Sequence, residues 1–178
     1  PAKSGRMHVL HLMQRMRARP SAAATGTTRL ADLIERARPS IKRRSAVFIV
    51  SDFISESGWE ASMARLAQKH DVVAVRLYDP LEMTLPELGM VLMQDAETGE
   101  QIFVDTGARG FRQRFEAAAE RREQELRTSL ARAGVDTLEL PTDADLGDSI
   151  LSFVDARRQR SRLAAGAMPL HNRARSVA

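Results

Sequence analysis

Residues 46–50 (Ala-Val-Phe-Ile-Val) form an uninterrupted apolar run rich in β-branched side chains. Strands exposed on one face alternate apolar and polar residues, whereas strands covered by helices on both faces are apolar throughout. Residues 72–78 are expected to form a second, largely apolar strand and residues 135–140 a third strand, and apolar residues at helical spacing separate the three. Residues 46–50 are therefore expected to be buried on both faces, and the alternation predicts an α/β domain in which about three parallel strands are flanked by helices.

The expected helices cover residues 6–19, 30–38, 59–70, 111–133 and 146–154. Residues 88–105 differ, because two apolar stretches flank the turn-forming sequence Asp-Ala-Glu-Thr-Gly, which predicts a β-hairpin. We expect this hairpin to lie beside the sheet as a peripheral element. Glu123 and Arg127 are expected to form an i,i+4 ion pair on the solvent side of the fourth helix.

After Arg157 the chain is rich in Arg, Ala and Ser without periodicity. Residues 1–158 are therefore expected to form the domain, with the hairpin as an insertion at 88–105. Residues 159–178 are expected to form a basic, mobile tail.

Composition narrows the classes of function. The 178 residues include no cysteine, which excludes disulfides and thiol catalysis. The net charge of +4 comes from scattered basic residues, a pattern typical of solvated helices, so no nucleic-acid partner is expected. No apolar run approaches the ~20 residues of a membrane span, and no signal-peptide pattern occurs. We therefore expect a cytoplasmic segment without membrane contact.

Acidic residues follow all three expected strands, at the end of a parallel sheet where ligands gather: Asp52, Asp79 and Asp143. Ser51 and Asp52 together offer oxygen donors that suit Mg²⁺. The alternative is a turn in which both side chains bond to the backbone. Thr28 has two similar interpretations, as the N-cap of the next helix or as a hydroxyl ligand.

Several segments, taken in order, resemble one bacterial family. It is the domain-of-unknown-function family fifty-eight, whose members contain a von Willebrand factor A-like domain and are typically encoded beside MoxR-type AAA+ ATPases. The resemblance extends over about residues 3–158. It rests on residues 5–10, 26–30 (GTTRL), 47–53 (VFIVSDF), 70–76 (HDVVAVR), 95–100 (DAETGE), 104–106 and 133–136 (AGVD). It implies a partial von Willebrand A-like, Rossmann-like three-layer sandwich.

Such domains usually carry a metal-ion-dependent adhesion site made from three loops. The resemblance implies that Thr28 is the ligand of the second loop and Asp52 that of the third, with Ser51 as a further candidate. Phe53 stands where many relatives have glycine. The first loop, Asp-x-Ser-x-Ser, does not occur in this chain and is expected upstream of Pro1, on the central strand. The metal site is therefore expected to be vestigial or incomplete, with Mg²⁺ bound weakly or not at all.

The resemblance thus implies a non-enzymatic protein-interaction domain that works with a MoxR-type ATPase in the assembly or maturation of protein complexes. Asp79 and Asp143 would lie on its partner-binding rim. The alternative is a Mg²⁺-dependent phosphoryl-transfer or hydrolytic enzyme that uses Asp52, Asp79 and Asp143. The full-length protein can carry upstream membrane helices, as some relatives do.

The absence of the first-loop strand has a structural consequence. Residues 46–50 would lie at the edge of the sheet, and the helices at 6–19 and 30–38 would lose part of the surface they cover. We therefore expect the chain to form a homodimer through this edge or through the exposed helix faces.

Overall fold

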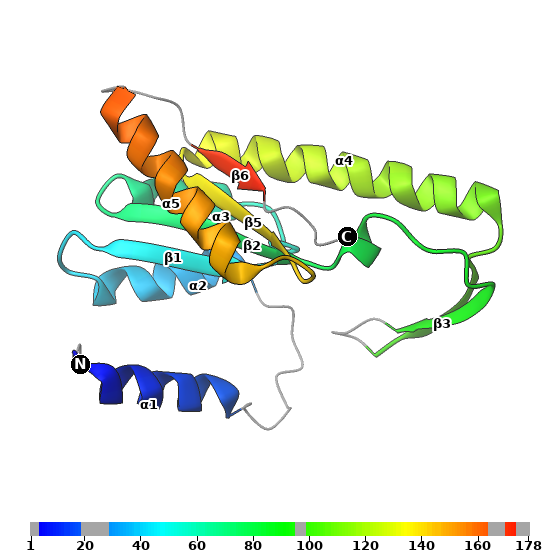
Figure 1. Cartoon of the computed structure of the whole chain (residues 1–178), viewed down its shortest axis with the longest axis horizontal. Coiled ribbons are helices and arrows are strands. Elements are labelled where there is room, and N and C mark those ends of the chain that lie inside the picture. The colour runs from blue at the N-terminus through cyan, green and yellow to red at the C-terminus, as the bar shows by residue number, and fades with distance from the viewer. Residues whose placement is uncertain (1–3, 19–28, 95–98, 164–169, 174–178) are drawn as a thin grey trace.

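The structure is a computed structural model that describes residues 4–18, 29–94, 99–163 and 170–173 of the chain (Figure 1). Its elements are, in chain order, α1 (Arg6–Arg17), α2 (Leu30–Ala37), η1 (Arg38–Ser40), β1 (Ala46–Ser51), α3 (Trp59–Ala67), β2 (Asp71–Tyr78), η2 (Pro80–Glu82), β3 (Met90–Gln94), β4 (Gln101–Asp105), α4 (Arg109–Ala133), β5 (Asp136–Pro141), α5 (Leu146–Leu163) and β6 (His171–Arg173).

The main sheet has the strand order β1-β2-β5-β6, and every neighbouring pair is parallel. The three long strands are those expected from the apolar runs, so the predicted α/β class is confirmed. β5 is buried at all six positions because it lies inside the sheet, between β2 and β6, with α4 on one face and α5 on the other. The short fourth strand, β6, was not expected.

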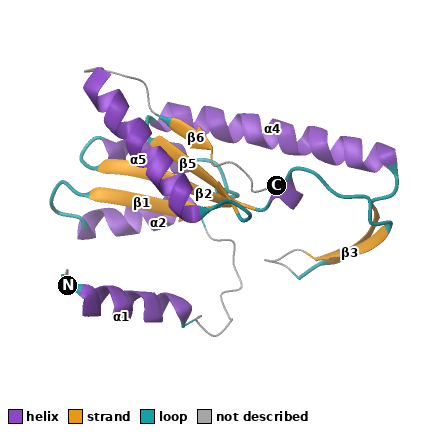
Figure 2. Cartoon of the chain, in the orientation of Figure 1, coloured by secondary structure: helices purple, strands orange, loops and turns teal. Residues whose placement is uncertain are grey.

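Helices cover the two faces of this sheet unequally (Figure 2). On one face, α2, α3 and α4 enclose a core that includes Leu30, Met63, Leu130 and Ala74. On the other face, α5 places Phe153 against β2 and β5 in a smaller core. The unequal cover leaves part of the α5 face of the sheet uncovered by the described residues.

Among the strands that the structure describes, β1 lies at the edge of the sheet. Val47 and Ile49 pack against the core on the α2 side. Phe48 and Val50 point to the opposite face and are 62% and 59% exposed. The expectation that this strand is buried on both faces is therefore wrong, because α5 packs Phe153 against β2 and β5 and leaves Phe48 and Val50 lining an open groove.

β3 and β4 form a separate two-stranded antiparallel sheet, which confirms the expected peripheral hairpin. Thr106 fixes its base. The Thr106 hydroxyl donates to the Gly89 carbonyl at 2.9 Å and accepts from the Leu88 N–H at 2.9 Å. The hairpin lies on the side of the main sheet toward which β1, β2 and β5 point (Figure 1).

The expected tail at 159–178 is wrong where the structure describes it. α5 continues to Leu163, and β6 pairs with β5. Asp136 joins the two, because its carboxylate accepts hydrogen bonds from Arg160 and from the Leu170 N–H, the latter at 2.6 Å. Arg157 adds a contact to the same carboxylate at 2.7 Å. The arginines thus pair within the fold, a role that composition alone does not reveal.

α1 differs from the other α-helices in having no buried residue. Met7, Val9, Met13 and Met16 are among its exposed apolar side chains. Within the described ranges, no helix combines the length and hydrophobicity needed to cross a bilayer.

Candidate functional site at the carboxyl end of the sheet

The chain leaves β1 through a tight turn that begins at Ser51 and Asp52. The Ser51 hydroxyl accepts from the Phe53 N–H at 3.0 Å and donates to the Asp52 carboxylate at 3.3 Å. The same carboxylate oxygen accepts from the Ile54 N–H at 3.0 Å. Both side chains therefore bond to the backbone, as the turn interpretation predicts, while the second Asp52 oxygen makes no bond in the turn.

Phe53 has a φ of 61°, in the left-handed region that only glycine adopts readily. Its ring is buried, and the ring centroid lies 5.3 Å from that of Trp59 at the start of α3. The turn therefore holds a phenylalanine in a backbone conformation that favours glycine. The aromatic contact stabilises a turn that costs backbone energy.

The other strand-end carboxylates are separate from this turn. Asp79 caps η2 by accepting from the Leu81 N–H at 2.9 Å, and the Glu82 side chain accepts from the Asp79 N–H. Asp143 is exposed in the loop after β5, which a bond from the Thr142 N–H to the Tyr78 carbonyl ties to β2. Thr28 lies outside the described residues.

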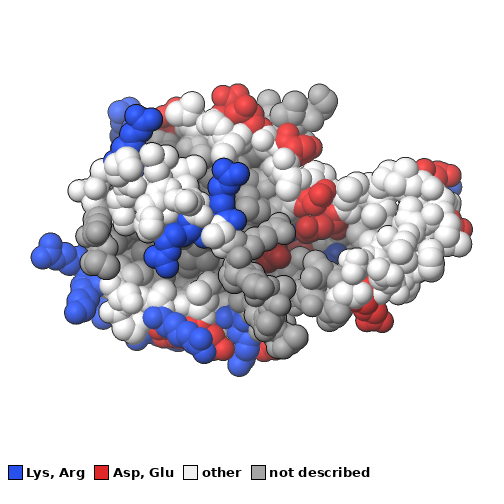
Figure 3. Space-filling model, turned by 90° about the horizontal axis from the view of Figure 1, so that it is seen from below, with Lys and Arg blue, Asp and Glu red and all other residues white. Residues whose placement is uncertain are grey.

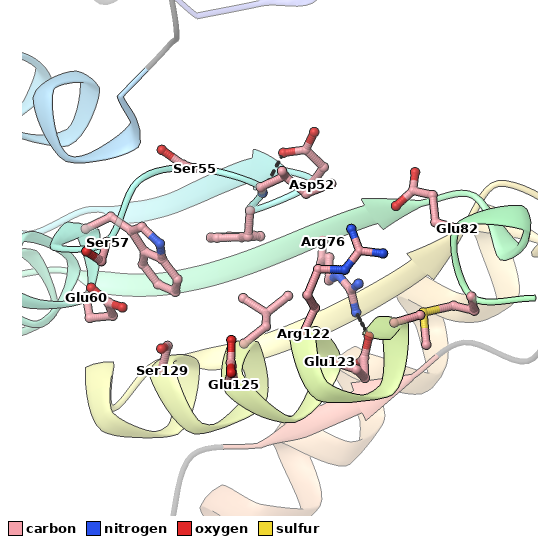
Figure 4. A pocket seen from close by; sticks show the side chains of 16 residues that line it. Asp52, Ser55, Ser57, Glu60, Arg76, Glu82, Arg122, Glu123, Glu125 and Ser129 are labelled. Carbon is pink, nitrogen blue, oxygen red and sulfur yellow. Dashed lines mark hydrogen bonds and ion pairs between the residues drawn. The ribbon is translucent and has the colours of Figure 1, made fainter. Parts of the chain in front are cut away.

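A pocket of about 320 Å³ opens between the Asp52 turn, α3 and α4 (Figure 4). Its lining combines carboxylates, hydroxyls and two arginines with an apolar floor. The charged and polar members are Asp52, Ser55, Ser57, Glu60, Arg76, Glu82, Arg122, Glu123, Glu125 and Ser129, and the floor includes Phe53, Trp59, Ala119 and Leu126. Carboxylates outnumber arginines, so the pocket is acidic.

The two arginines of the pocket differ in their bonding. Arg76, from the middle of β2, is held by Glu123 of α4 at 2.6 Å and stacks over the Tyr78 ring at 4.7 Å. Arg122 extends from α4 alongside it (Figure 4). It has no hydrogen bond or ion pair with any residue that the structure describes. Arg122 is therefore a cation available to a carboxylate brought by another molecule.

A buried network of charges lies beneath the pocket. The Arg76 and Glu123 side chains are only 8% and 9% exposed. Glu139 of β5 is fully buried, with contacts to Arg76 at 3.7 Å, Arg127 at 3.8 Å and His171 at 2.8 Å. Four elements, β2, β5, α4 and β6, thus meet around compensating charges.

Burial alone would raise the pKa of Glu139. The hydrogen bond from His171 and the charges of His171, Arg127 and Arg76 outweigh burial and hold that pKa below its ordinary value. Glu139 is therefore an anion at neutral pH and keeps its positive neighbours in place.

The expectation for Glu123 and Arg127 is corrected by this network. Their ion pair exists, at 3.2 Å, but Glu123 faces the sheet instead of solvent. Sequence reasoning missed Arg76, Glu123 and Glu139 as partners. The available signal was a charged residue in the middle of each of two apolar strands, since a buried charge requires a partner.

The described residues do not by themselves make a magnesium site. Among them, no group of three or more His, Asp or Glu side chains is placed to hold one ion, so Asp52, Asp79 and Asp143 do not share a site. Asp52 and Ser51 offer two oxygen side chains that already bond within the turn. Mg²⁺ requires a near-octahedral shell and loses water reluctantly, so this pair alone is a poor ligand set.

Together these features define a single α/β domain with an acidic pocket at the carboxyl end of a parallel sheet and a projecting hairpin. The chain belongs to the DUF58 family, described as a protein family of unknown function, whose sequence profile matches residues 1–125.

Among its relatives is the uncharacterized protein MAV169 of Mycobacterium avium, 32% identical over 161 residues that make up 89% of this chain and 94% of that protein. Uncharacterized protein Rv1480 of Mycobacterium tuberculosis is 31% identical over 89% of this chain, which spans 50% of that relative's length. The chain is also similar to the crystal structure of the conserved hypothetical protein BatB from Bacteroides thetaiotaomicron, with a TM-score of 0.44, 12% identity and coverage of 87% and 69% of the two chains.

Proposed function

We propose that this chain is a non-enzymatic protein-interaction domain that works with a MoxR-type AAA+ ATPase in the assembly or maturation of protein complexes in the cytoplasm. The observation that carries the proposal is the apolar hairpin, β3–β4, beside the carboxyl end of the sheet. The acidic pocket and the free Arg122 guanidinium at the same end provide polar contacts for the same partner.

An isolated two-stranded sheet is at best marginally stable in water. The exposed apolar side chains of this hairpin therefore favour packing against another surface. Leu92 lies opposite Phe103 in the antiparallel pair, and Met90 lies on the same face. Phe103 is 72% exposed, and Met90 and Leu92 are exposed as well. Figure 3 shows few charged side chains on the lobe that holds the hairpin. Contiguous exposed apolar surface of this kind marks protein-interaction sites.

The proposal includes a von Willebrand A-like architecture with a vestigial metal site. Asp52, Ser51 and Thr28 are its remnants, and Asp79 and Asp143 are part of the rim that the partner contacts. The left-handed turn at Phe53 supports this interpretation, because the backbone keeps a conformation that favours glycine where many relatives have one.

Binding to a MoxR-type ATPase from the same genome tests the proposal. We expect Leu92→Asp to weaken this binding at least about tenfold, because it places a charge in the centre of the apolar hairpin face. The matched control is Leu33→Asp, since Leu33 is exposed to a similar degree on α2. Calorimetry with the purified ATPase measures both affinities. Equal affinities for Leu92→Asp and the unaltered chain would contradict the proposed role of the hairpin.

A second expectation concerns magnesium. Titration of Mg²⁺ into this chain is expected to give no saturable heat at micromolar concentrations. The Asp52→Asn variant should give the same titration curve as the unaltered chain. A longer protein that includes an Asp-x-Ser-x-Ser loop is expected to bind Mg²⁺ measurably. That loop would supply the ion with oxygen ligands in addition to the Asp52 carboxylate. Tight binding by the 178-residue chain that is lost in Asp52→Asn would show that the site is complete without the loop.

A further inference from the structure

The pocket beside Asp52 has an excess of unpaired carboxylates. Four of its five acidic residues form no ion pair within the described part of the chain: Asp52, Glu60, Glu82 and Glu125. They come from four different elements, namely the turn after β1, α3, η2 and α4 (Figure 4). Of the two arginines in the lining, only Arg122 is unpaired among the described residues. The pocket therefore carries uncompensated negative charge, which attracts a cation.

One of these carboxylates is held in its charged form by its surroundings. Burial would raise the pKa of Glu60. Hydrogen bonds from its own N–H and from the Gly58 N–H at 2.8 Å, and another with Ser129, outweigh burial. Together with the charge of Arg132 they hold that pKa below its ordinary value. Glu60 is therefore an anion at neutral pH.

A second feature of the pocket indicates a hydrogen-bond acceptor on the ligand. Trp59 lines the pocket and is only 3% exposed. Its indole N–H donates to no residue that the structure describes, and the nitrogen is not sealed inside the core. Buried indole N–H groups usually have an acceptor. A ligand in the pocket would supply the acceptor that Trp59 lacks.

We propose that the pocket receives an arginine or lysine side chain of the partner, carried on a peptide segment whose backbone carbonyl accepts from Trp59. This inference rests on the proposed function, since it names the chemistry by which the partner is recognised. The unpaired carboxylates bind the cationic end of the side chain. Phe53 and Leu126, which belong to the apolar floor, pack against its methylene stem.

The lining of the pocket fits other classes of ligand less well. A phosphate or a nucleic acid would accept from Trp59 and Arg122 but would lie among four unpaired carboxylates. A metal ion would use the carboxylates alone, and among the described residues no three of them are placed to share one ion. The cavity of about 320 Å³ is near the lower end of the roughly 300–1,000 Å³ typical of ligand pockets. It therefore suits one side chain better than a cofactor.

The test uses Trp59 as its reporter. It is the single tryptophan of the chain, so its indole N–H gives one peak in a proton–nitrogen NMR spectrum. The probe is the blocked tripeptide acetyl-Gly-Arg-Gly-amide, titrated into the whole chain at millimolar concentrations. We expect a saturable downfield shift of the indole proton, because the N–H gains an acceptor. The same tripeptide with glutamine or glutamate in place of arginine should bind at least about threefold more weakly, because it lacks the cation.

A charge variant tests the carboxylates. Glu125→Gln should raise the dissociation constant of the arginine tripeptide at least about threefold, because it removes one unpaired charge from the pocket. The matched control is Glu120→Gln, since Glu120 is also exposed on α4 but does not line the pocket. Its dissociation constant should equal that of the unaltered chain. Both substitutions keep the size of the side chain, so circular dichroism should show the same fold.

Several outcomes would overturn the inference. Absence of saturation at tens of millimolar would show that the pocket does not bind a basic side chain. Equal binding of the glutamine tripeptide would show that charge has no role, and tighter binding of the glutamate tripeptide would make Arg122 the recognition element. Equal effects of Glu125→Gln and Glu120→Gln would reduce binding to net charge. None of these outcomes bears on the hairpin, whose role is measured separately by the affinity of Leu92→Asp for the ATPase.

Discussion

Replacing Arg76 with alanine is expected to lower the free energy of unfolding by about 3–5 kcal/mol. Arg76 is buried beside two carboxylates, with Glu123 at 2.6 Å and Glu139 at 3.7 Å. Without the guanidinium, two negative charges would lie together under α4 with Arg127 and His171 as their remaining partners. Urea unfolding followed by circular dichroism measures the change.

An exposed ion pair provides the control. Arg38 and Glu35 form an ion pair at 3.0 Å, but both side chains are well exposed. Arg38→Ala should therefore cost less than about 1 kcal/mol. The double variant Arg76→Met with Glu123→Leu should recover part of the loss, because it removes both charges and keeps volume. If Arg76→Ala cost no more than Arg38→Ala, the network would have to be hydrated and of little energetic weight.

The elements of this fold follow closely from local sequence. Gly134 ends α4 in the left-handed conformation expected of a glycine after a helix. The hairpin follows from two apolar stretches around a turn sequence, and β1 follows from an uninterrupted apolar run. In each case a few neighbouring residues determine the structure, so the sequence pattern is sufficient.

Long-range pairing is what the sequence pattern leaves undetermined. Glu123 has the spacing of a surface ion pair with Arg127, yet it faces Arg76, 47 positions away in the chain. Asp136 binds Arg160, which composition assigns to a tail. A charge pairs with whatever the fold brings near it, and periodicity contains no information about that neighbour. The position of a charge inside an apolar strand is nevertheless a signal that a buried partner exists.

The strand-end aspartates were also only partly predictable. Their place at the carboxyl end of the sheet follows from strand order, but the use of each side chain depends on the next few backbone groups. Asp52 and Asp79 each accept from an N–H two residues ahead, a local bond that many loops form. Residue type and position therefore identify where a site could lie, whereas the turn geometry shows how the oxygens are used.

Phe53 gives the second large expected effect. Phe53→Ala should lower the free energy of unfolding by about 3–5 kcal/mol, because it removes a buried ring that packs against Trp59. Phe53→Gly removes the same ring but relieves the left-handed backbone at φ 61°. Glycine should therefore be more stable than alanine at this position by about 1 kcal/mol. Urea unfolding of both variants measures the difference.

Inside a helix the ranking of the two variants should be the opposite, with alanine more stable than glycine. Met63 is fully buried in the middle of α3, and Met63→Ala should be more stable than Met63→Gly by about 1 kcal/mol. If the free energy of unfolding of Phe53→Gly were no higher than that of Phe53→Ala, the turn after Asp52 would carry no backbone strain. A reversal at Phe53 together with the ordinary order at Met63 would instead mean that the aromatic contact with Trp59 maintains a glycine-like turn. The conformation of the Asp52 loop would then depend on core packing under the pocket.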